Sequence, residues 1–445
     1  MGETLFFQKR GSPKVYIIKK KRCYLIKVHE LGNGLRVVME AIPFVRSVSF
    51  GVWVRSGSRN ETSDNNGISH FIEHMLFKGT EKRSAMEIAD TMDAVGGQLN
   101  AFTSKEYTCY FTRTLDTHFD VALDVLSDMF FNSRLNQEDI DKERGVILEE
   151  ISMYEDTPED LAVDLLQYKT FPRSSLGMSI LGTPETIGGF NSEQFKKFMG
   201  VRYAPRNVVI AVAGNIDEAE VLDKITRAFG HYKGEPDIFD EKPAVYTPGF
   251  SLKEKDIEQV HLCVGFPGIR TGIDESYALA AVNTILGGGM SSRLFQKIRE
   301  QHGLVYTVYS YNASYYDTGV FLVYAALNPD NVFDVLGLIS QEVRGMLTDK
   351  INAEQLSKAK EQLKSNFLLS LENAASRMNS IGRTLLMLDK VITPDELVTK
   401  IDAIDLDAFF AVCEKIFKMD QISLSLVGKK VEGLKESDLT NAVTN

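Results

Sequence analysis

Two histidines and a glutamate stand at helical spacing in the first part of the chain. His70, Glu73 and His74 spell H-x-x-E-H within the run from Gly67 to Thr80, the inverted order of the zinc-protease helix signature. Residues four apart share one face of a helix, so both imidazoles can reach one metal ion about 2.0–2.1 Å away, with the Glu73 carboxylate beside them. One helical turn would supply two metal ligands and a general base, the residue types for metal-assisted hydrolysis.

A third ligand is needed, because a catalytic zinc has three protein ligands and an open position for water. A chance occurrence of the motif is a weak explanation, since only seven histidines occur in 445 residues. Downstream, the segment 141–156 is predicted to be a long helix on which Glu143 and Glu150, seven residues apart, share a face. Glutamates on helices are usually solvated surface acids, but the upstream motif favours a ligand here. Spacing alone does not separate Glu150 from Glu149.

These motifs resemble those of the pitrilysin, insulysin and mitochondrial processing peptidase family, the inverzincin zinc metallopeptidases, and in particular its small single-chain bacterial type. The family pattern places a ligand Glu downstream of H-x-x-E-H and an auxiliary Glu seven residues before that ligand, which Glu150 and Glu143 match. The resemblance implies that zinc is the cofactor and that Glu150 is the third ligand. The similarity also covers residues 96–108, 287–295 and 299–306, and spans nearly the whole chain from Leu31.

A repeated order of elements predicts two homologous-looking halves. Each half mixes strands and long helices in α+β fashion, with a mostly antiparallel sheet flanked by helices. The resemblance implies that the halves face each other across a substrate chamber. The paired strands are Val48–Val54 with Gln259–Phe266, Cys109–Leu115 with Val320–Leu327, and Asn207–Gly214 with Gln421–Gly428.

Four regions are predicted along the chain. Residues 1–30 are an N-terminal extension, whose basic stretch is interpreted as an additional strand or an overlong gene start. Residues 31–234 form the catalytic zinc-binding domain, and residues 235–249 form a linker because prolines stand among acidic residues there. Residues 250–445 form a second pseudo-symmetric domain that completes the substrate site.

The second half lacks a metal motif, because the segment that corresponds to the H-x-x-E-H helix reads Tyr277–Leu286, without ligands. It carries Arg299 and Tyr306, and the resemblance implies that these side chains reach across to the substrate at the zinc. In the first half, Asn100 and Ala101 follow paired glycines and precede a strand. They are predicted to bind substrate backbone at a free sheet edge, with a turn Asn as the alternative for Asn100.

The predicted function is that of a zinc-dependent endopeptidase that cleaves peptides or unfolded precursor segments. Glu73 takes the proton of an activated water as general base, and Tyr306 donates to the developing oxyanion while Arg299 holds a neighbouring substrate carbonyl. Glu143 is expected to orient a histidine or the water and not to bind the metal itself, since a fourth protein ligand would close the site. The alternative is a noncatalytic scaffold or core subunit of the same fold. The sequence leaves presequence cleavage, peptide scavenging and precursor maturation open.

Composition restricts the partners. A formal net charge of −11 disfavours nucleic acid, and no apolar stretch has the ~20 residues needed to span a bilayer. The four cysteines are scattered without C-x-x-C, which fits a reducing compartment. The cytoplasm is therefore predicted, with the mitochondrial matrix as the alternative. The resemblance implies a homodimer or pairing with a similar chain.

Overall fold

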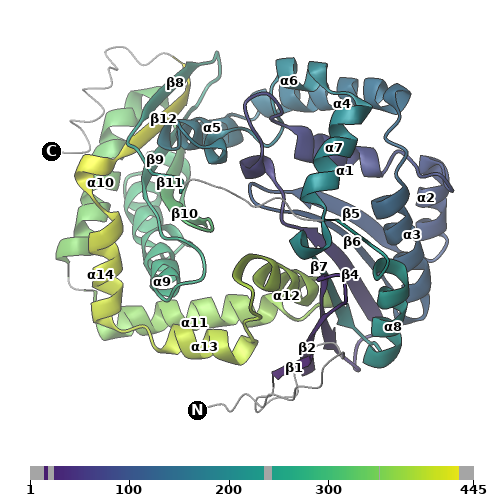
Figure 1. Ribbon diagram of the computed structural model, residues 1–445. Helices are drawn as coiled ribbons and strands as arrows, with labels where there is room; N and C mark the ends of the chain where they lie inside the picture. The colour runs from purple at the N-terminus through teal and green to yellow at the C-terminus, as the bar shows by residue number, and fades with distance from the viewer. Residues whose placement is uncertain (1–14, 19–24, 235–242, 350, 430–445) are drawn as a thin grey trace.

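Two β-sheets, one from each half of the chain, form the framework of the protein (Figure 1). The computed structural model describes residues 15–18, 25–234, 243–349 and 351–429. Residues 235–242 of the predicted linker and parts of the predicted N-terminal extension lie outside the described residues.

In spatial order, the seven strands of the first sheet are β1 (Val15–Ile18), β2 (Leu25–Glu30), β3 (Arg36–Ala41), β7 (Val208–Gly214), β4 (Ser47–Val54), β6 (Thr108–Leu115) and β5 (Gln98–Thr103). The five strands of the second sheet are β10 (Val305–Ser314), β11 (Gly319–Leu327), β9 (Val260–Pro267), β12 (Ser423–Gly428) and β8 (Phe250–Glu254).

The two sheets repeat one topology. The order β3-β7-β4-β6-β5 of the first sheet corresponds to β8-β12-β9-β11-β10 of the second. In both sheets the first of these pairs, β3 with β7 and β8 with β12, is parallel, and the other pairs are antiparallel. The prediction of two similar α+β halves with mostly antiparallel sheets is therefore confirmed. Strands β1 and β2, from the predicted extension, lengthen the first sheet at its β3 edge.

Helices flank both sheets. Their sequences carry the expected start signals: the Asn136 side chain, for example, caps α4 by accepting the N–H of Asp139. The helices of the first half are α1 (Ile68–Leu76), α2 (Ala85–Asp93), α3 (Phe119–Asn132), α4 (Gln137–Glu155), α5 (Pro158–Thr170), α6 (Pro184–Gly189), α7 (Ser192–Arg202) and α8 (Glu218–Phe229). Those of the second half are α9 (Glu275–Gly287), α10 (Val332–Thr348), α11 (Ala353–Ser370), α12 (Ala374–Leu388), α13 (Pro394–Asp402) and α14 (Leu406–Ile416). A π-helix, η5, spans Phe295–Gln301, and short 3-10 helices include η1 (Ser58–Asn60).

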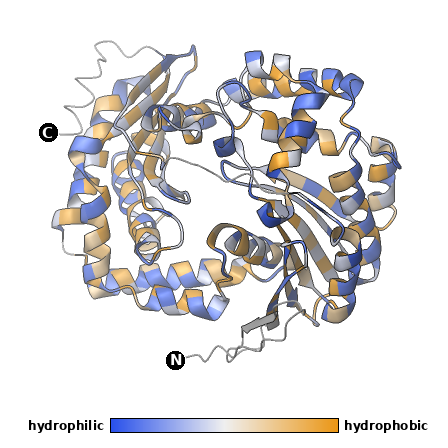
Figure 2. Ribbon diagram, in the orientation of Figure 1, coloured by the Kyte–Doolittle hydropathy of each residue, from blue (hydrophilic) through white to orange (hydrophobic). Residues whose placement is uncertain are grey.

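Hydrophobic residues concentrate along the strands and on the inward faces of the helices (Figure 2). The central strands β7 and β11 are buried along their whole length, because helices or the opposite half cover both of their faces. Among the described residues, no helix is both long enough and apolar enough to cross a bilayer.

The halves exchange one helix each. Helix α5, from the first half, packs on β12, β9 and β8 of the second sheet, and helix α12, from the second half, packs on β4, β7 and β3 of the first (Figure 1). The packing is close: an ideal Cβ at Gly51 of β4 would lie 2.6 Å from the Met378 sulfur, and one at Gly265 of β9 would lie 2.8 Å from a Leu166 methyl carbon. The predicted domain limits divide the strands between the sheets, but each core also includes a helix from the other half. The limits themselves stay predictions.

We expect Met378→Ala to lower the free energy of unfolding of the first half by about 2–5 kcal/mol, the usual cost of truncating a buried methionine. Met378 is buried on α12, and its sulfur lies 3.4 Å from the indole nitrogen of Trp53. Urea unfolding followed by the fluorescence of Trp53, the only tryptophan of the chain, measures this loss. Arg383→Ala, on the exposed side of α12, is the matched control and should change stability by under about 0.5 kcal/mol. Equal stability of the two variants would contradict the exchange.

Candidate metal centre

Helix α1 carries the H-x-x-E-H motif, and a buried carboxylate holds its N-terminus. The helix begins after Gly67, whose φ of 94° is a conformation that favours glycine. No side chain at this position caps the helix; instead Glu61 accepts the backbone N–H groups of Gly67 at 2.7 Å and Ser69 at 2.8 Å, and the Asn66 amide at 2.9 Å. Burial raises the pKa of Glu61 against these hydrogen bonds. A carboxylate here satisfies helix N–H groups that would otherwise lack partners, and so fixes where α1 starts.

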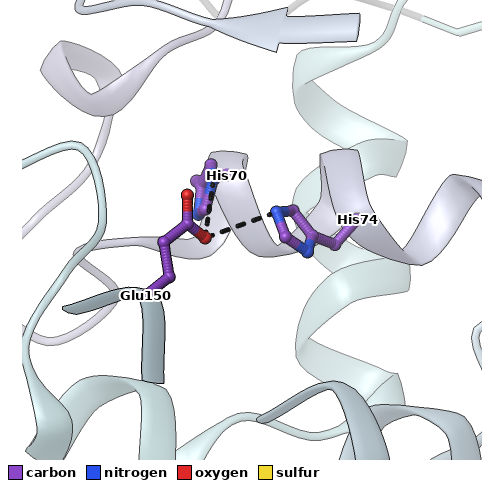
Figure 3. A group of neighbouring side chains, drawn as sticks. All are labelled: His70, His74 and Glu150. Carbon is purple, nitrogen blue, oxygen red and sulfur yellow. Dashed lines mark ion pairs between the residues drawn. The ribbon is translucent and has the colours of Figure 1, made fainter. Parts of the chain in front are cut away.

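The side chains of His70, His74 and Glu150 converge from α1 and α4 (Figure 3). One possible ligand atom from each lies within 4.8 Å of the other two. The Glu150 Oε2 atom is 3.7 Å from His70 Nε2 and 3.6 Å from His74 Nε2. These separations are too long for hydrogen bonds, but they are close to the ~3.4 Å between two ligand atoms on one tetrahedral ion.

The chemistry of this donor set fits a zinc ion. Glu150 Oε2 is buried and has no hydrogen-bond partner among the described residues, a costly state unless something else binds it. Burial, with a contribution from the nearby His74, lowers the pKa of His70 to about 3, so this imidazole is neutral and keeps a lone pair for a metal. Two imidazoles and one carboxylate match a catalytic zinc site with an open position.

Glu143 lies behind His74 rather than with the three ligand candidates. Its Oε1 atom is 2.8 Å from His74 Nδ1, and its Oε2 atom is 2.5 Å from the ammonium of Lys78. Burial favours a higher pKa for Glu143, but the contacts with His74 and Lys78 outweigh it and lower that pKa. An ionised Glu143 favours a proton on His74 Nδ1; in the neutral imidazole this leaves the lone pair on Nε2, the nitrogen that faces Glu150. This arrangement supports an orienting role.

Glu73, the candidate general base, is held by a residue that sequence reasoning missed. The hydroxyl of Thr103, at the end of β5, donates to Glu73 Oε2 at 2.5 Å. Burial raises the pKa of Glu73, and the Thr103 hydrogen bond opposes this only in part. A carboxylate with a raised pKa is better suited to accept a proton near neutral pH.

Asn100 and Ala101 lie on β5, an edge strand of the first sheet, which among the described residues pairs only with β6. Asn100 is exposed, and its side-chain oxygen accepts the Ala101 N–H at 2.8 Å. The hairpin closes with a bond from the Ser104 N–H to the Tyr107 carbonyl. Alternation along an antiparallel ladder then directs the backbone groups of Leu99, Ala101 and Thr103 to the free edge. The structure thus has Asn100 in a strand and not in a turn.

Arg299 and Tyr306 lie next to each other on the other half. The Arg299 guanidinium carbon is 5.7 Å from the centre of the Tyr306 ring, and both side chains are exposed, Tyr306 to 73%. The β10–β11 register shifts between Val305 and Thr307, so Tyr306 is the extra residue of a bulge that turns its side chain outward. Within the described part of the chain, no hydrogen bond or ion pair joins either residue to His70, His74 or Glu150.

Three supporting residues had weak or no signals in the sequence. Thr103 stands two residues after Ala101 on the same strand face, and Lys78 follows His74 by four residues. Neither position indicates a role until the carboxylate that it contacts is known, Glu73 for Thr103 and Glu143 for Lys78. Glu61 lies in a loop before the helix, where no periodicity marks it.

Comparisons with known proteins match most of the chain to peptidases. Residues 36–184 match Insulinase (Peptidase family M16), and residues 189–363 match the Peptidase M16 inactive domain. An uncharacterized zinc protease of Bacillus subtilis is 44% identical over 397 residues, which cover 89% of this chain and 97% of the relative. An uncharacterized zinc protease of Streptomyces coelicolor is 40% identical over 406 residues, 89% of this chain and 88% of the relative.

Solved structures share the fold. The crystal structure of a protease from Helicobacter pylori has a TM-score of 0.85 at 22% identity and covers 91% of this chain and 99% of its own. A chain in Complex III2 from Candida albicans, Inz-5 bound, has a TM-score of 0.82 at 21% identity and covers 94% and 99%. At these identities the likeness shows the fold alone.

We expect His70→Ala and Glu150→Ala to abolish stoichiometric zinc binding, because each removes one of three ligands. Elemental analysis of the purified variants measures the loss. Glu149→Ala is the matched control, since it removes the neighbouring, exposed carboxylate of α4, and it should keep one zinc per chain. Loss of zinc in Glu149→Ala with retention in Glu150→Ala would reverse the assignment of the third ligand.

Proposed function

The chain belongs to the insulinase family of peptidases, family M16, whose cofactor is zinc, and on this premise we propose that it is an endopeptidase that cleaves peptides or unfolded precursor segments. The observation that carries the proposal is the convergence of His70, His74 and Glu150 around a buried carboxylate oxygen that has no hydrogen-bond partner in the described part of the chain. Glu73 stands on the same helical turn as both histidines. A noncatalytic core subunit is not favoured, because it has no need for this set of groups.

Each residue has one role in the proposed reaction. His70, His74 and Glu150 hold the zinc, which when bound acidifies water and polarises the scissile carbonyl. Glu73 accepts a proton from the attacking water and later delivers it to the leaving amine. Glu143 keeps His74 in the tautomer that binds through Nε2.

The substrate is proposed to bind as an extended strand along the outer edge of β5. The edge position of this strand and the outward backbone groups of Leu99 and Thr103, together with the Ala101 carbonyl, support this mode, since peptides commonly add to a free sheet edge. Asn100 would hold the substrate backbone through its exposed amide. From the second half, Tyr306 would donate to the developing oxyanion and Arg299 would hold a neighbouring carbonyl.

We further propose that two copies, or this chain and a similar one, pair to complete the chamber. The exposure of Arg299 and Tyr306, on the half without the metal residues, supports this pairing. The relatives named above are bacterial, which favours the cytoplasm over the mitochondrial matrix as the proposed compartment.

Glu73→Gln should retain zinc and lose about 10²–10⁴-fold in turnover, because the amide cannot take the proton while the ligands are untouched. Zinc content and kcat on a quenched fluorescent peptide, measured on the same preparation, test this. Loss of zinc as complete as in Glu150→Ala would make Glu73 a ligand instead of a base.

Tyr306→Phe should lower turnover about 10²–10³-fold, the usual effect of removing one oxyanion donor, with zinc content unchanged. Tyr168→Phe is the matched control, since Tyr168 is also exposed but lies on α5, and it should behave as wild type.

The same variants test the pairing. If one copy completes the site of the other, a mixture of Glu73→Gln and Tyr306→Phe should regain part of the wild-type rate, because mixed dimers contain one intact site. A mixture as inactive as its components would contradict completion of the site by a second copy.

A further inference from the structure

The tip of the β5–β6 hairpin contacts both halves of the chain and directly follows β5, the strand that carries Thr103. This tip, residues 104–107, follows Thr103 directly. Opposite it lies the turn between β10 and β11, closed by the bond from the Tyr315 N–H to the Thr318 carbonyl. The carboxylate of Glu106 accepts the backbone N–H of Tyr316 at 2.9 Å. A residue of the catalytic half is therefore bonded to the backbone of the second half.

A buried cation joins the same two turns. The Arg59 guanidinium donates to Glu106 at 2.7 Å and to Asp317 at 2.6 Å. Side-chain exposures of 3% for Arg59, 10% for Glu106 and 17% for Asp317 show that little water reaches the cluster. Charge-assisted hydrogen bonds in such surroundings are strong and directional. Asp317 also accepts the N–H of Ala244 at 2.8 Å. The cluster therefore also contacts the segment that joins the two halves.

The first half holds the tip from its other side through backbone contacts. The Arg59 N–H donates to the Lys105 carbonyl at 2.7 Å. At Gly57 an ideal Cβ would lie 2.2 Å from the Ser104 carbonyl oxygen, so only glycine permits this approach. The tip is thus fixed between the two halves.

A short path connects the tip to the general base. Thr103 immediately precedes the tip, and its hydroxyl donates to Glu73 at 2.5 Å. A displacement of the tip that carried Thr103 with it would remove the donor that orients the carboxylate of Glu73.

We propose that Glu106, with Arg59 and Asp317, is a positioning group that holds Thr103, and through it the general base Glu73, in register with the second half of the chain. The proposal rests on the proposed role of Glu73. It gives the second half, which has no ligand in the metal cluster, a direct influence on the catalytic base.

Two single substitutions test the cluster from opposite halves. Glu106→Gln and Asp317→Asn each remove one carboxylate and leave Arg59 paired with the other, so each variant should fold with a full zinc content. We expect kcat to fall about 10²-fold in both, as misplacement of a reacting group typically causes, with KM and zinc affinity unchanged. If one variant does not fold, the other still decides the outcome.

Glu40→Gln is the matched control for a purely structural role. Glu40 is a buried carboxylate on β3 that pairs with Arg377 of α12, so it also joins the halves through an ion pair, but it does not touch the hairpin tip. This variant should unfold at a lower temperature and keep the wild-type kcat. A loss of kcat in Glu40→Gln equal to that in Glu106→Gln would overturn the proposal.

A double-mutant cycle with Thr103→Val tests the path itself. If Glu106 acts through Thr103, the double variant should lose no more kcat than the more impaired single variant, whereas independent effects would multiply. Multiplied losses, or wild-type kcat in both folded cluster variants, would overturn the positioning role. Wild-type turnover of Glu73→Gln would instead overturn the proposed function, and that measurement does not involve the tip.

Discussion

The hydrogen bond between His74 and Glu143 ties the two helices of the metal centre together. It crosses from α1 to α4 at 2.8 Å and directs the other nitrogen of the imidazole toward Glu150. Since Glu143 and Glu150 stand two turns apart on α4, the same rotation of α4 that makes this bond also presents Glu150, the candidate third ligand. A change of one residue in the register of α4 would turn both carboxylates away by about 100°.

The position of α4 depends in turn on the second half of the chain. At its C-terminal end, Lys255, the residue directly after β8, pairs with Asp156 at 3.1 Å, a favourable place for a cation because helix carbonyls are unpaired there. The chain then enters α5, which lies on the second sheet. The hydroxyl of Tyr309, on β10, donates to Glu159 at the start of α5 at 2.5 Å. The helix that brings Glu143 and Glu150 to the histidines is therefore held at one end by the half without ligands.

The exchange of α5 and α12 joins the two similar halves into one folded unit, although only one half carries the candidate metal ligands. Each sheet would expose a large apolar face if the other half were absent, as the contacts of Trp53 with Met378 and of Leu166 with β9 show. The buried cluster of Arg59, Glu106 and Asp317 adds a polar connection. Packing and charge together keep the edge strands β5 and β10, which carry candidate substrate-binding residues, in a fixed relation.

The sequence by itself indicated the main elements and the residue types of the candidate metal centre. Helical spacing brings His70, Glu73 and His74 to one face, and the repeated strand pattern predicted three strands of each sheet, because these features depend on periods of a few residues. Resemblance to a family separated Glu150 from Glu149, which spacing could not do. The tertiary structure decided which distant groups support these residues: Thr103 beside Glu73, Lys78 beside Glu143, and α12 on the first sheet. Such pairings join residues far apart in the chain, and they depend on how the helices and sheets pack, which no local pattern encodes.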